Sequence, residues 1–252
     1  GSDVADNIFA ELVEIQNKVR DYFGWDYQDD FLSATSISQA FNSSAPFNIT
    51  NWSPKNRQAN LAALKEKLLA ASKVVIVGAS VKENDFANFD FENSIVIAAD
   101  GSVGGVVGMV NLACVVTDFD GNPHLDKVAK EGVTFVAHAH GDNTKRWRKS
   151  LDRWSCLESP PNLILTHQVT ESIDGVHNFG GFTDGDRAVC FAINLGVPIN
   201  KITLLGFSTT EIGKWSGQTN PERKMEKLDW MLKILQIIGL EQQVATNAYV
   251  EP

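Results

Sequence analysis

The sequence predicts an α/β protein whose sheet is mostly parallel and covered by helices on both faces, which makes three layers. Two observations support this fold class. Short apolar runs alternate with helix-like segments across residues 72–240, and these runs are continuous, as in strands that are buried on both faces. We expect a Rossmann-like α/β domain over residues 71–252, which would carry the functional site, and a helical N-terminal extension over residues 1–70.

The N-terminal extension contains two predicted helices. Apolar residues recur at spacings of three and four over residues 3–23, which indicates an amphipathic helix. Ser53 and Pro54 form a typical helix start, with serine as the N-cap and proline in the first turn, and this helix should run to about residue 71. The stretch between the two helices, residues 25–53, is rich in aromatic residues without a clear period. We expect it to be irregular chain that packs onto the body of the protein.

The α/β domain divides into predicted strands and helices. The strands are expected over residues 73–77, 94–99, 113–117, 133–137, 163–166 and 201–205. The helices are expected over residues 102–110, 123–131, 142–157, 184–195 and 222–238. Residues 168–182 form a loop rich in glycine and polar side chains. In a parallel sheet the turns that follow the strands meet at one edge, and open α/β sheets bind their ligands there.

Composition disfavours some classes of function. The chain has 252 residues and a formal net charge of −9, so it is a poor non-specific binder of nucleic acid or of membrane surfaces. We therefore expect no nucleic-acid partner and no membrane partner, and no apolar run approaches the ~20 residues of a membrane-spanning helix. The three cysteines are far apart, which is typical of a reduced, cytoplasmic protein. The sequence leaves a homodimer open.

Two acidic turns follow neighbouring predicted strands. Asp118 and Asp120 come directly after the strand at 113–117, and Asp100 follows the strand before it. Carboxylate oxygens in a small cluster suit Mg²⁺ better than Zn²⁺, and Mg²⁺ held in this way typically bridges substrate phosphates. The alternative interpretation is that Asp118 caps the turn or the next helix, while Asp120 is solvated.

The segment His138-Ala-His-Gly-Asp-Asn143 follows a buried strand and opens a polar, basic segment. His138, His140 and Asp142 could ligate zinc, but a zinc hydrolase would want further histidine or cysteine ligands in a recognisable motif. The competing interpretation is that the histidines bind phosphate or position the substrate while Asp142 contacts Mg²⁺. The basic residues within 145–149 could neutralise the phosphates of a nucleotide or form a solvated helix face.

The stretch Gly180-Gly-Phe-Thr-Asp-Gly-Asp-Arg187 runs from a loop into a predicted helix. Backbone N–H groups at a helix start bind anions, and Thr183 and Arg187 could add contacts to a polyphosphate. Asp184 and Asp186 could add metal ligands. The plainer interpretation is a helix capped by Thr183, which is compatible with ligand binding. Together the turns predict Mg²⁺-dependent phosphate chemistry, which needs no activated nucleophile.

Four motifs, taken in order, resemble those of one known family. They are Asp100-Gly101, Thr117-Asp-Phe-Asp-Gly121, His138-Ala-His-Gly-Asp-Asn143 and Gly180-Gly-Phe-Thr-Asp-Gly-Asp-Arg187. This set is similar to that of the archaeal 6-hydroxymethyl-7,8-dihydropterin pyrophosphokinases, a family related in fold to the catalytic domain of thiamine pyrophosphokinase. The resemblance covers roughly residues 70–235. After the last strand this chain has Gly206-Phe-Ser-Thr209 where the family pattern is Gly-Met-Asp-Phe, so the acid of that pattern is missing.

The resemblance implies an enzyme that transfers the β,γ-diphosphate of ATP to the hydroxymethyl group of the pterin and releases AMP, in folate or tetrahydromethanopterin biosynthesis. ATP is then a co-substrate and Mg²⁺ the cofactor. The metal ligands that it implies are Asp100, Asp118, Asp120 and Asp142. The residues that it implies for nucleotide phosphates or a second metal are Asn143, Gly180, Gly181, Thr183, Asp184, Asp186 and Arg187. The catalytic residues would then be Asp118, Asp120 and Asp142, with His138 or His140 as a general base.

The acceptor is the least determined part of this interpretation. Asn178, Phe179 and Phe182 are candidates for holding the pterin by position alone, because a pterin needs an amide or carboxylate on its amino-pyrimidine edge and an aromatic stack. The nearest competing function is a diphosphokinase for thiamine or another small alcohol. The sequence is also compatible with a nucleotide-sugar or glycosyltransferase-like protein and with a non-catalytic nucleotide-binding module.

Overall fold

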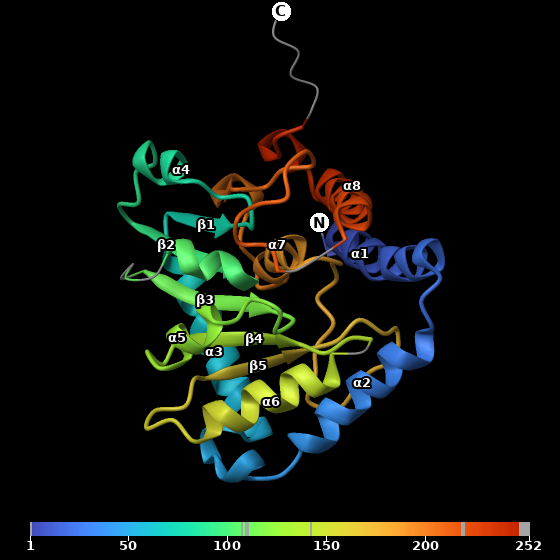
Figure 1. Cartoon of the computed structure of the whole chain (residues 1–252), viewed down its shortest axis with the longest axis vertical. Coiled ribbons are helices and arrows are strands. Elements are labelled where there is room, and N and C mark those ends of the chain that lie inside the picture. The colour runs from blue at the N-terminus through green and yellow to red at the C-terminus, as the bar shows by residue number, and fades with distance from the viewer. Residues whose placement is uncertain (1, 107, 109–110, 142, 218–219, 247–252) are drawn as a thin grey trace, which may run out of the picture.

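The computed structural model describes residues 2–106, 108, 111–141, 143–217 and 220–246. Within these ranges six parallel strands form one sheet with helices on both faces (Figure 1). The strands are β1 (Lys73–Val77), β2 (Ser94–Ala99), β3 (Leu112–Thr117), β4 (Thr134–His138), β5 (Leu163–Thr166) and β6 (Ile202–Leu205). Their order is β5-β4-β3-β2-β1-β6, and every neighbouring pair is parallel. The predicted three-layer α/β class is confirmed.

Helices precede, separate and follow the strands. They are α1 (Ser2–Phe23), α2 (Tyr27–Ala40), α3 (Pro54–Ala70), α4 (Glu83–Ala87), α5 (His124–Ala129), α6 (Thr144–Ser155), α7 (Asp184–Asn194) and α8 (Pro221–Ile238). Short 3₁₀ turns occupy Pro46–Asn48, Thr50–Trp52, Asp100–Gly105, Ile199–Lys201 and Glu241–Gln243. In the described part of the chain, none of the helices has both the length and the apolar character that a membrane crossing requires.

Alternate residues of each strand face opposite layers of helices. In β1, Val74 and Ile76 pack in one hydrophobic cluster with residues of α1, α3, α7 and α8. Val75 and Val77 pack in a second cluster with residues of α5 and α6. Covering both faces explains why the strands are apolar throughout. Because α1 and α3 share a cluster with the sheet, the N-terminal extension packs directly against the α/β layers (Figure 1).

Two predicted segments differ from the structure. The prediction of irregular chain over residues 25–53 is wrong in part, because α2 lies within this stretch. The N-cap of this helix is Asp26, whose side chain accepts a hydrogen bond from the backbone N–H of Gln28 at 2.9 Å. Its buried positions include Asp30 and Ser33, so an apolar period does not reveal it. The helix expected over residues 102–110 is a 3₁₀ turn in its first part, and residues 107, 109 and 110 lie outside the described residues.

The strand order reverses beside β1. Strands β1 to β5 follow one another across the sheet, and β6 then pairs with the other side of β1. A Cβ atom at Gly78 would lie 2.6 Å from the carbonyl oxygen of Gly206, so the loops after β1 and β6 approach this closely only with glycine at position 78. Open α/β sheets bind ligands at such a reversal of strand order.

Candidate active site

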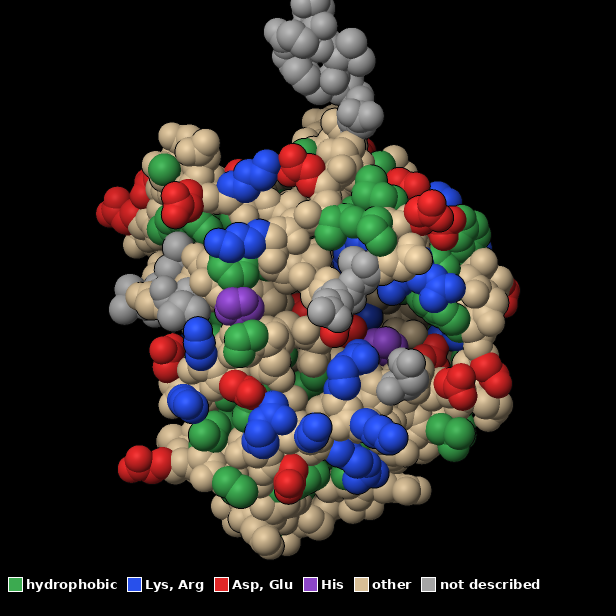
Figure 2. Space-filling model, viewed as in Figure 1, with side chains coloured by type: hydrophobic (Ala, Val, Ile, Leu, Met, Phe, Trp, Pro, Cys, Tyr) green, Lys and Arg blue, Asp and Glu red, His purple; other side chains and the backbone are tan. Residues whose placement is uncertain are grey.

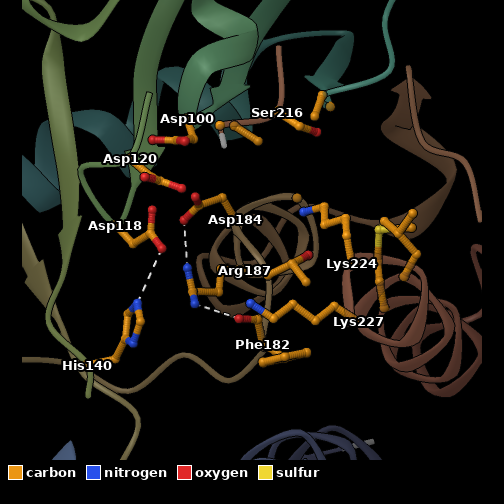
Figure 3. A pocket seen from close by; sticks show the side chains of 18 of the residues that line it. Asp100, Asp118, Asp120, His140, Phe182, Asp184, Arg187, Ser216, Lys224 and Lys227 are labelled. Carbon is orange, nitrogen blue, oxygen red and sulfur yellow. Dashed lines mark hydrogen bonds and ion pairs between the residues drawn. The ribbon is translucent and has the colours of Figure 1, made fainter. Parts of the chain in front are cut away.

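A cavity of about 630 Å³ opens at the carboxyl edge of the sheet, beside the reversal of strand order. Its walls come from the loops after β1, β2, β3, β4 and β6, from the first turn of α7 and from α8. Trp25, Asp29 and Asp30, at the junction of α1 and α2, form a further wall. Figure 3 shows acidic side chains on one side of the cavity and Lys224 and Lys227 of α8 on the other.

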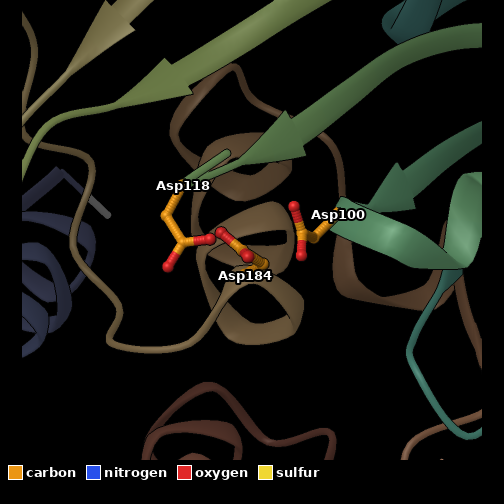
Figure 4. A group of neighbouring side chains, drawn as sticks. All are labelled: Asp100, Asp118 and Asp184. Carbon is orange, nitrogen blue, oxygen red and sulfur yellow. The ribbon is translucent and has the colours of Figure 1, made fainter. Parts of the chain in front are cut away.

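Three carboxylates, which we call the carboxylate trio, lie together in this cavity. Asp100 follows β2, Asp118 follows β3 and Asp184 is the first residue of α7. One oxygen from each residue lies within 4.8 Å of the other two, and Figure 4 shows the three side chains pointing toward one another. The sheet brings the first two together because β2 and β3 are neighbours, and α7 packs against both strands.

Burial and mutual repulsion raise the free energy of the state in which all three carboxylates are ionised. Burial, followed by the negative charges of Asp118 and Asp120, raises the pKa of Asp100 to about 7. Burial and the same kind of repulsion raise the pKa of Asp184 well above its ordinary value. A divalent cation would remove this repulsion, because it favours the ionised form of every carboxylate around it.

Asp118 is the member of the trio whose pKa is lowered by neighbouring side chains. Burial alone would raise its pKa, but His140, Arg187 and Arg146 together hold the pKa of Asp118 well below its ordinary value. Its Oδ2 lies 3.2 Å from His140 Nε2 and 3.9 Å from Arg146 Nη2. Its Oδ1 is buried without a hydrogen-bond partner among the described residues. A buried, ionised oxygen without a donor is suited to a metal ion.

The turn after β2 is tied to the turn after β3. Asp100 Oδ1 accepts hydrogen bonds from Thr117 Oγ1 at 2.5 Å and from the backbone N–H of Gly121 at 3.1 Å. A Cβ atom at Gly121 would lie 2.5 Å from the backbone nitrogen of Gly101. The glycine of the second acidic motif therefore lets the two turns approach, and the approach brings Asp100 close to Asp118.

The two aspartates in the first turn of α7 have different surroundings. Asp186 is fully buried and accepts hydrogen bonds from Thr183 N at 3.0 Å and Thr183 Oγ1 at 2.7 Å. It therefore caps the helix, and it does not line the cavity. Thr183, Asp184 and Arg187 do line the cavity. Arg187 Nη1 lies 2.6 Å from Asp184 Oδ1, which places a cation next to the trio.

The two histidines of the His-x-His motif have different surroundings. His138 is buried, with Nδ1 2.8 Å from Thr166 Oγ1 and Nε2 2.8 Å from Gln168 Oε1. Burial holds the pKa of His138 well below its ordinary value. Both ring nitrogens are engaged and the residue is not part of the cavity wall, so His138 is badly placed to take a proton from a substrate. His140 does line the cavity, with Nε2 on Asp118.

Several residues predicted to contact ligands have structural contacts within the chain. Asn143 is buried, and its Nδ2 donates to the carbonyl oxygen of His138 at 2.7 Å. Gly180 and Gly181 have φ angles of 91° and 93°, in the left-handed region that favours glycine, and they shape the loop before α7. Neither these glycines nor Asn143 line the cavity. Asp142, which was predicted as a metal ligand, lies outside the described residues.

Of the residues predicted to hold the pterin, Phe182 lines the cavity, whereas Asn178 and Phe179 do not. Asn178 Nδ2 donates to the carbonyl oxygen of Val169 at 2.9 Å, and the ring of Phe179 packs edge-on against another phenylalanine. Ser208, which stands where the family pattern has an acid, lines the cavity and accepts a hydrogen bond from a backbone N–H at 3.0 Å.

The sequence did not indicate the wall that comes from the N-terminal extension. Trp25, Asp29 and Asp30 lie on α1–α2 segments far from any motif, and the only signal was the aromatic content of residues 25–53. The basic segment divides in two. Arg146 of α6 lines the cavity, whereas Lys145, Arg148 and Lys149 are exposed. Figure 2 shows basic side chains gathered over the region where α6 lies.

Comparisons with known proteins give the family of the chain. No model of a known protein family matches it. It is 36% identical over 184 residues to the 6-hydroxymethyl-7,8-dihydropterin pyrophosphokinase of Pyrococcus furiosus, an alignment that spans 69% of this chain and 75% of that protein. The protein of the same name from Methanothermobacter thermautotrophicus is 38% identical over 125 residues, 48% of this chain and 49% of that protein. The one from Methanocaldococcus jannaschii is 25% identical over 185 residues, 69% of each chain. The motifs and this similarity agree, and the chain belongs to the family of 6-hydroxymethyl-7,8-dihydropterin pyrophosphokinases.

Proposed function

We propose that this protein transfers a diphosphate group from ATP to the hydroxymethyl group of 6-hydroxymethyl-7,8-dihydropterin, uses Mg²⁺ and releases AMP. Membership of the family supports the reaction and the acceptor. The single observation that carries the proposal is the carboxylate trio in a cavity that also contains several cationic side chains. Carboxylates for a metal ion and cations for phosphates are what transfer from a nucleotide requires, because the protein mainly positions the groups and neutralises charge.

The donor set of the trio fits Mg²⁺. Asp100, Asp118 and Asp184 offer only carboxylate oxygens, which hard cations prefer, and the unpartnered Oδ1 of Asp118 supports the same assignment. These three residues would hold the ion, and bound there it would neutralise charge on the ATP phosphates. Asp120 was also predicted as a ligand. It lines the cavity outside the trio, and Figure 3 shows it between Asp100 and Asp118.

Cationic side chains would hold the phosphates of ATP. Arg187 is oriented by its ion pair with Asp184, and a guanidinium is well suited to phosphate oxygens. Lys224 and Lys227 line the cavity from α8. The first turn of α7 also reaches the cavity at Thr183, and the N–H groups of a first helical turn, which have no partner within the helix, bind anions.

In the proposed reaction the hydroxyl oxygen of the pterin attacks the β-phosphorus of ATP. A bond forms between this oxygen and the β-phosphorus, and the bond from the β-phosphorus to the α,β-bridging oxygen breaks. AMP leaves with the bridging oxygen and its electron pair, and the hydroxyl proton is released as the new ester forms. The residues of the cavity hold the two substrates in line, and little base assistance is needed in a loose transition state.

The aromatic side of the cavity would hold the pterin. Phe182 and Trp25 both line it, with ring centroids 5.9 Å apart, and aromatic faces bind flat heterocycles by stacking. Asp29 is exposed on the same wall and could accept hydrogen bonds from the amino-pyrimidine edge. The acceptor site would then be shared between the N-terminal extension and the loop before α7.

The test is the formation of AMP from ATP and Mg²⁺ with and without 6-hydroxymethyl-7,8-dihydropterin. Pterin-dependent AMP, together with a pterin diphosphate product, is the expected result. Formation of ADP would mean that a single phosphate is transferred, and it would contradict the proposed diphosphate transfer. An absence of nucleotide turnover with the pterin would contradict the acceptor, and thiamine and nucleotide sugars would then be assayed in the same way.

A further inference from the structure

A buried ion pair joins α1 and α2 beside the active site. Arg20 Nη1 lies 2.8 Å from Asp30 Oδ2, and the two side chains expose only 4% and 6% of their surface. The same Arg20 nitrogen donates to the carbonyl oxygen of Gln168 at 2.8 Å. A buried ion pair is often no more stabilising than apolar residues of the same volume, so stability alone does not explain a charged pair at this place.

Asp30 uses both of its carboxylate oxygens. Besides Arg20, Oδ2 accepts a hydrogen bond from Gln168 Nε2 at 2.9 Å. Oδ1 accepts one from the backbone N–H of Gly141 at 2.6 Å. Gly141 has a φ of 41° and lies in the loop that follows β4, of which residues 139–141 and 143 are described. The N-terminal extension thus fixes the backbone of the loop that carries the His-x-His motif.

The fixed loop reaches the carboxylate trio through its second histidine. His140 is the residue before Gly141, and its Nε2 lies 3.2 Å from Asp118 Oδ2. The other carboxylate oxygen of Asp118, Oδ1, is buried and has no hydrogen-bond partner among the described residues. The polar contacts of Asp30 are to Arg20, Gln168 and Gly141, so its influence on Asp118 passes through the loop.

A second branch of the network fixes the base of the same loop. Because Gln168 Nε2 donates to Asp30, the side-chain oxygen of Gln168 faces His138 and accepts from its Nε2 at 2.8 Å. His138 Nδ1 is then the acceptor for the hydroxyl of Thr166 at 2.8 Å. Asp30 therefore selects the tautomer of His138 at one end of the loop and holds Gly141 in its middle.

We propose that Asp30 is a positioning residue of the active site, which holds the backbone at Gly141 so that His140 keeps Asp118 oriented toward the rest of the trio. The proposal rests on the metal-binding role proposed for the trio. Its consequence is that residues 1–70, which supply none of the trio, set the metal affinity of the α/β domain.

The test is Mn²⁺ binding to the full chain, measured as free Mn²⁺ by electron paramagnetic resonance in the absence of pterin. Asp30→Asn should weaken Mn²⁺ binding about tenfold, because changing the groups that orient metal ligands typically costs 10–100-fold in affinity. Asp30→Glu keeps a charge opposite Arg20 but moves the acceptor for Gly141. It should also weaken binding, and it keeps the test decisive if the asparagine variant does not fold.

Arg57→Gln is the matched control. Arg57 is another buried arginine of the N-terminal extension, and its Nη1 donates to the carbonyl oxygens of Phe41 at 2.8 Å and Trp52 at 2.6 Å. Its loss should destabilise the protein without changing Mn²⁺ affinity. Destabilisation without weaker binding in the Asp30 variants would reduce their role to folding and overturn the proposal.

His140→Ala tests the route. It should weaken Mn²⁺ binding by itself, and adding Asp30→Asn to it should then weaken binding less than about twofold further, because residues that act through one another are not additive. Full additivity would overturn the route through His140. The proposed reaction can fail independently, since a chain that binds Mn²⁺ with this coupling but forms no AMP contradicts only the reaction. A wild-type chain that binds no Mn²⁺ overturns the metal site and this proposal together.

Discussion

Asp118 is the residue on which most contacts of the site converge. One oxygen faces His140 and Arg146, and the other is buried beside the two further carboxylates of the trio. Asp118→Asn keeps the shape and removes the charge, so we expect pterin-dependent AMP formation to fall by at least about 100-fold, as when a group that stabilises transition-state charge is removed. Asp152→Asn, an exposed change on α6, should leave the rate unchanged. Full activity of the Asp118 variant would contradict the metal assignment.

Asp100 should show a trade-off between stability and function. An asparagine at this position can keep the oxygen that accepts from Thr117 and Gly121, while one of three crowded charges disappears. At pH 8 without divalent ions, we expect Asp100→Asn to raise the free energy of unfolding by about 1 kcal/mol or more, as functional sites commonly cost stability. Urea unfolding measures this, and added Mg²⁺ should stabilise the variant less than the wild type. A variant less stable than wild type would contradict repulsion within the trio.

At the scale of residues, the sequence indicated which acidic residues belong to the site better than it indicated the role of each one. Asp100 and Asp118 could be brought together from sequence because each follows a strand and the two strands are neighbours. Asp184 was assigned to phosphates or a second metal, since an acid in the first turn of a helix is indistinguishable from a cap without its neighbours. His138 could not be separated from His140, because only the partners Thr166 and Gln168 show that it is enclosed.

At the scale of elements, α6 presents one arginine to the cavity and another to solvent. Arg146 lines the cavity, whereas Arg148 is exposed and lies over the ring of Trp147. We expect Arg146→Gln to raise the KM for ATP about tenfold, the cost of one charge-assisted contact to phosphate. Arg148→Gln changes the net charge equally and should leave the KM unchanged. Steady-state kinetics at fixed salt compares the two, and equal effects would mean that the helix acts only through its overall charge.

The elements that could be predicted from the sequence have signals within their own residues, either apolar positions or capping residues. The strands are continuous apolar runs, and α3 and α8 have caps that are visible in sequence, Ser53 and Gly239. α2 was missed because its inward face carries Asp30 and Ser33, whose partners lie in the loop after β4. A helix whose buried face is polar can be recognised only when the groups that it binds are known.

At the scale of the whole molecule, alternation along the chain predicted the layers but not the order of strands. Nothing in the sequence of β6 states that it pairs with β1 instead of β5. The position of the cavity depends on that pairing, because the loops after β1 and β6 both line it. The wall that Trp25, Asp29 and Asp30 add to the cavity depends likewise on contacts between distant segments, such as the one between Arg20 and Gln168.

Buried histidines give the whole molecule a stability that depends on pH. Burial holds the pKa of His138 well below its ordinary value, and it lowers the pKa of His167 to about 4. In the unfolded chain a histidine titrates near ~6.5. Between these two values the unfolded chain binds more protons than the folded protein, so stability is complete above the unfolded pKa and falls as the pH drops toward the folded one.

Because the pKa of His167 is lower in the folded protein than in the unfolded chain, this residue alone should lower the free energy of unfolding by about 2 kcal/mol between pH 7 and pH 5. Its Nδ1 accepts a hydrogen bond from the backbone N–H of Val169 at 3.0 Å, and the side-chain oxygen of an asparagine can take over that role without titrating. Urea unfolding of the wild type and of His167→Asn at both pH values measures the difference. The variant should lose about 2 kcal/mol less than the wild type on acidification, while the buried His138 continues to destabilise both proteins. Equal losses in the two proteins would mean that His167 is protonated as easily in the folded state as in the unfolded chain, and the acid sensitivity would then belong to the other histidines.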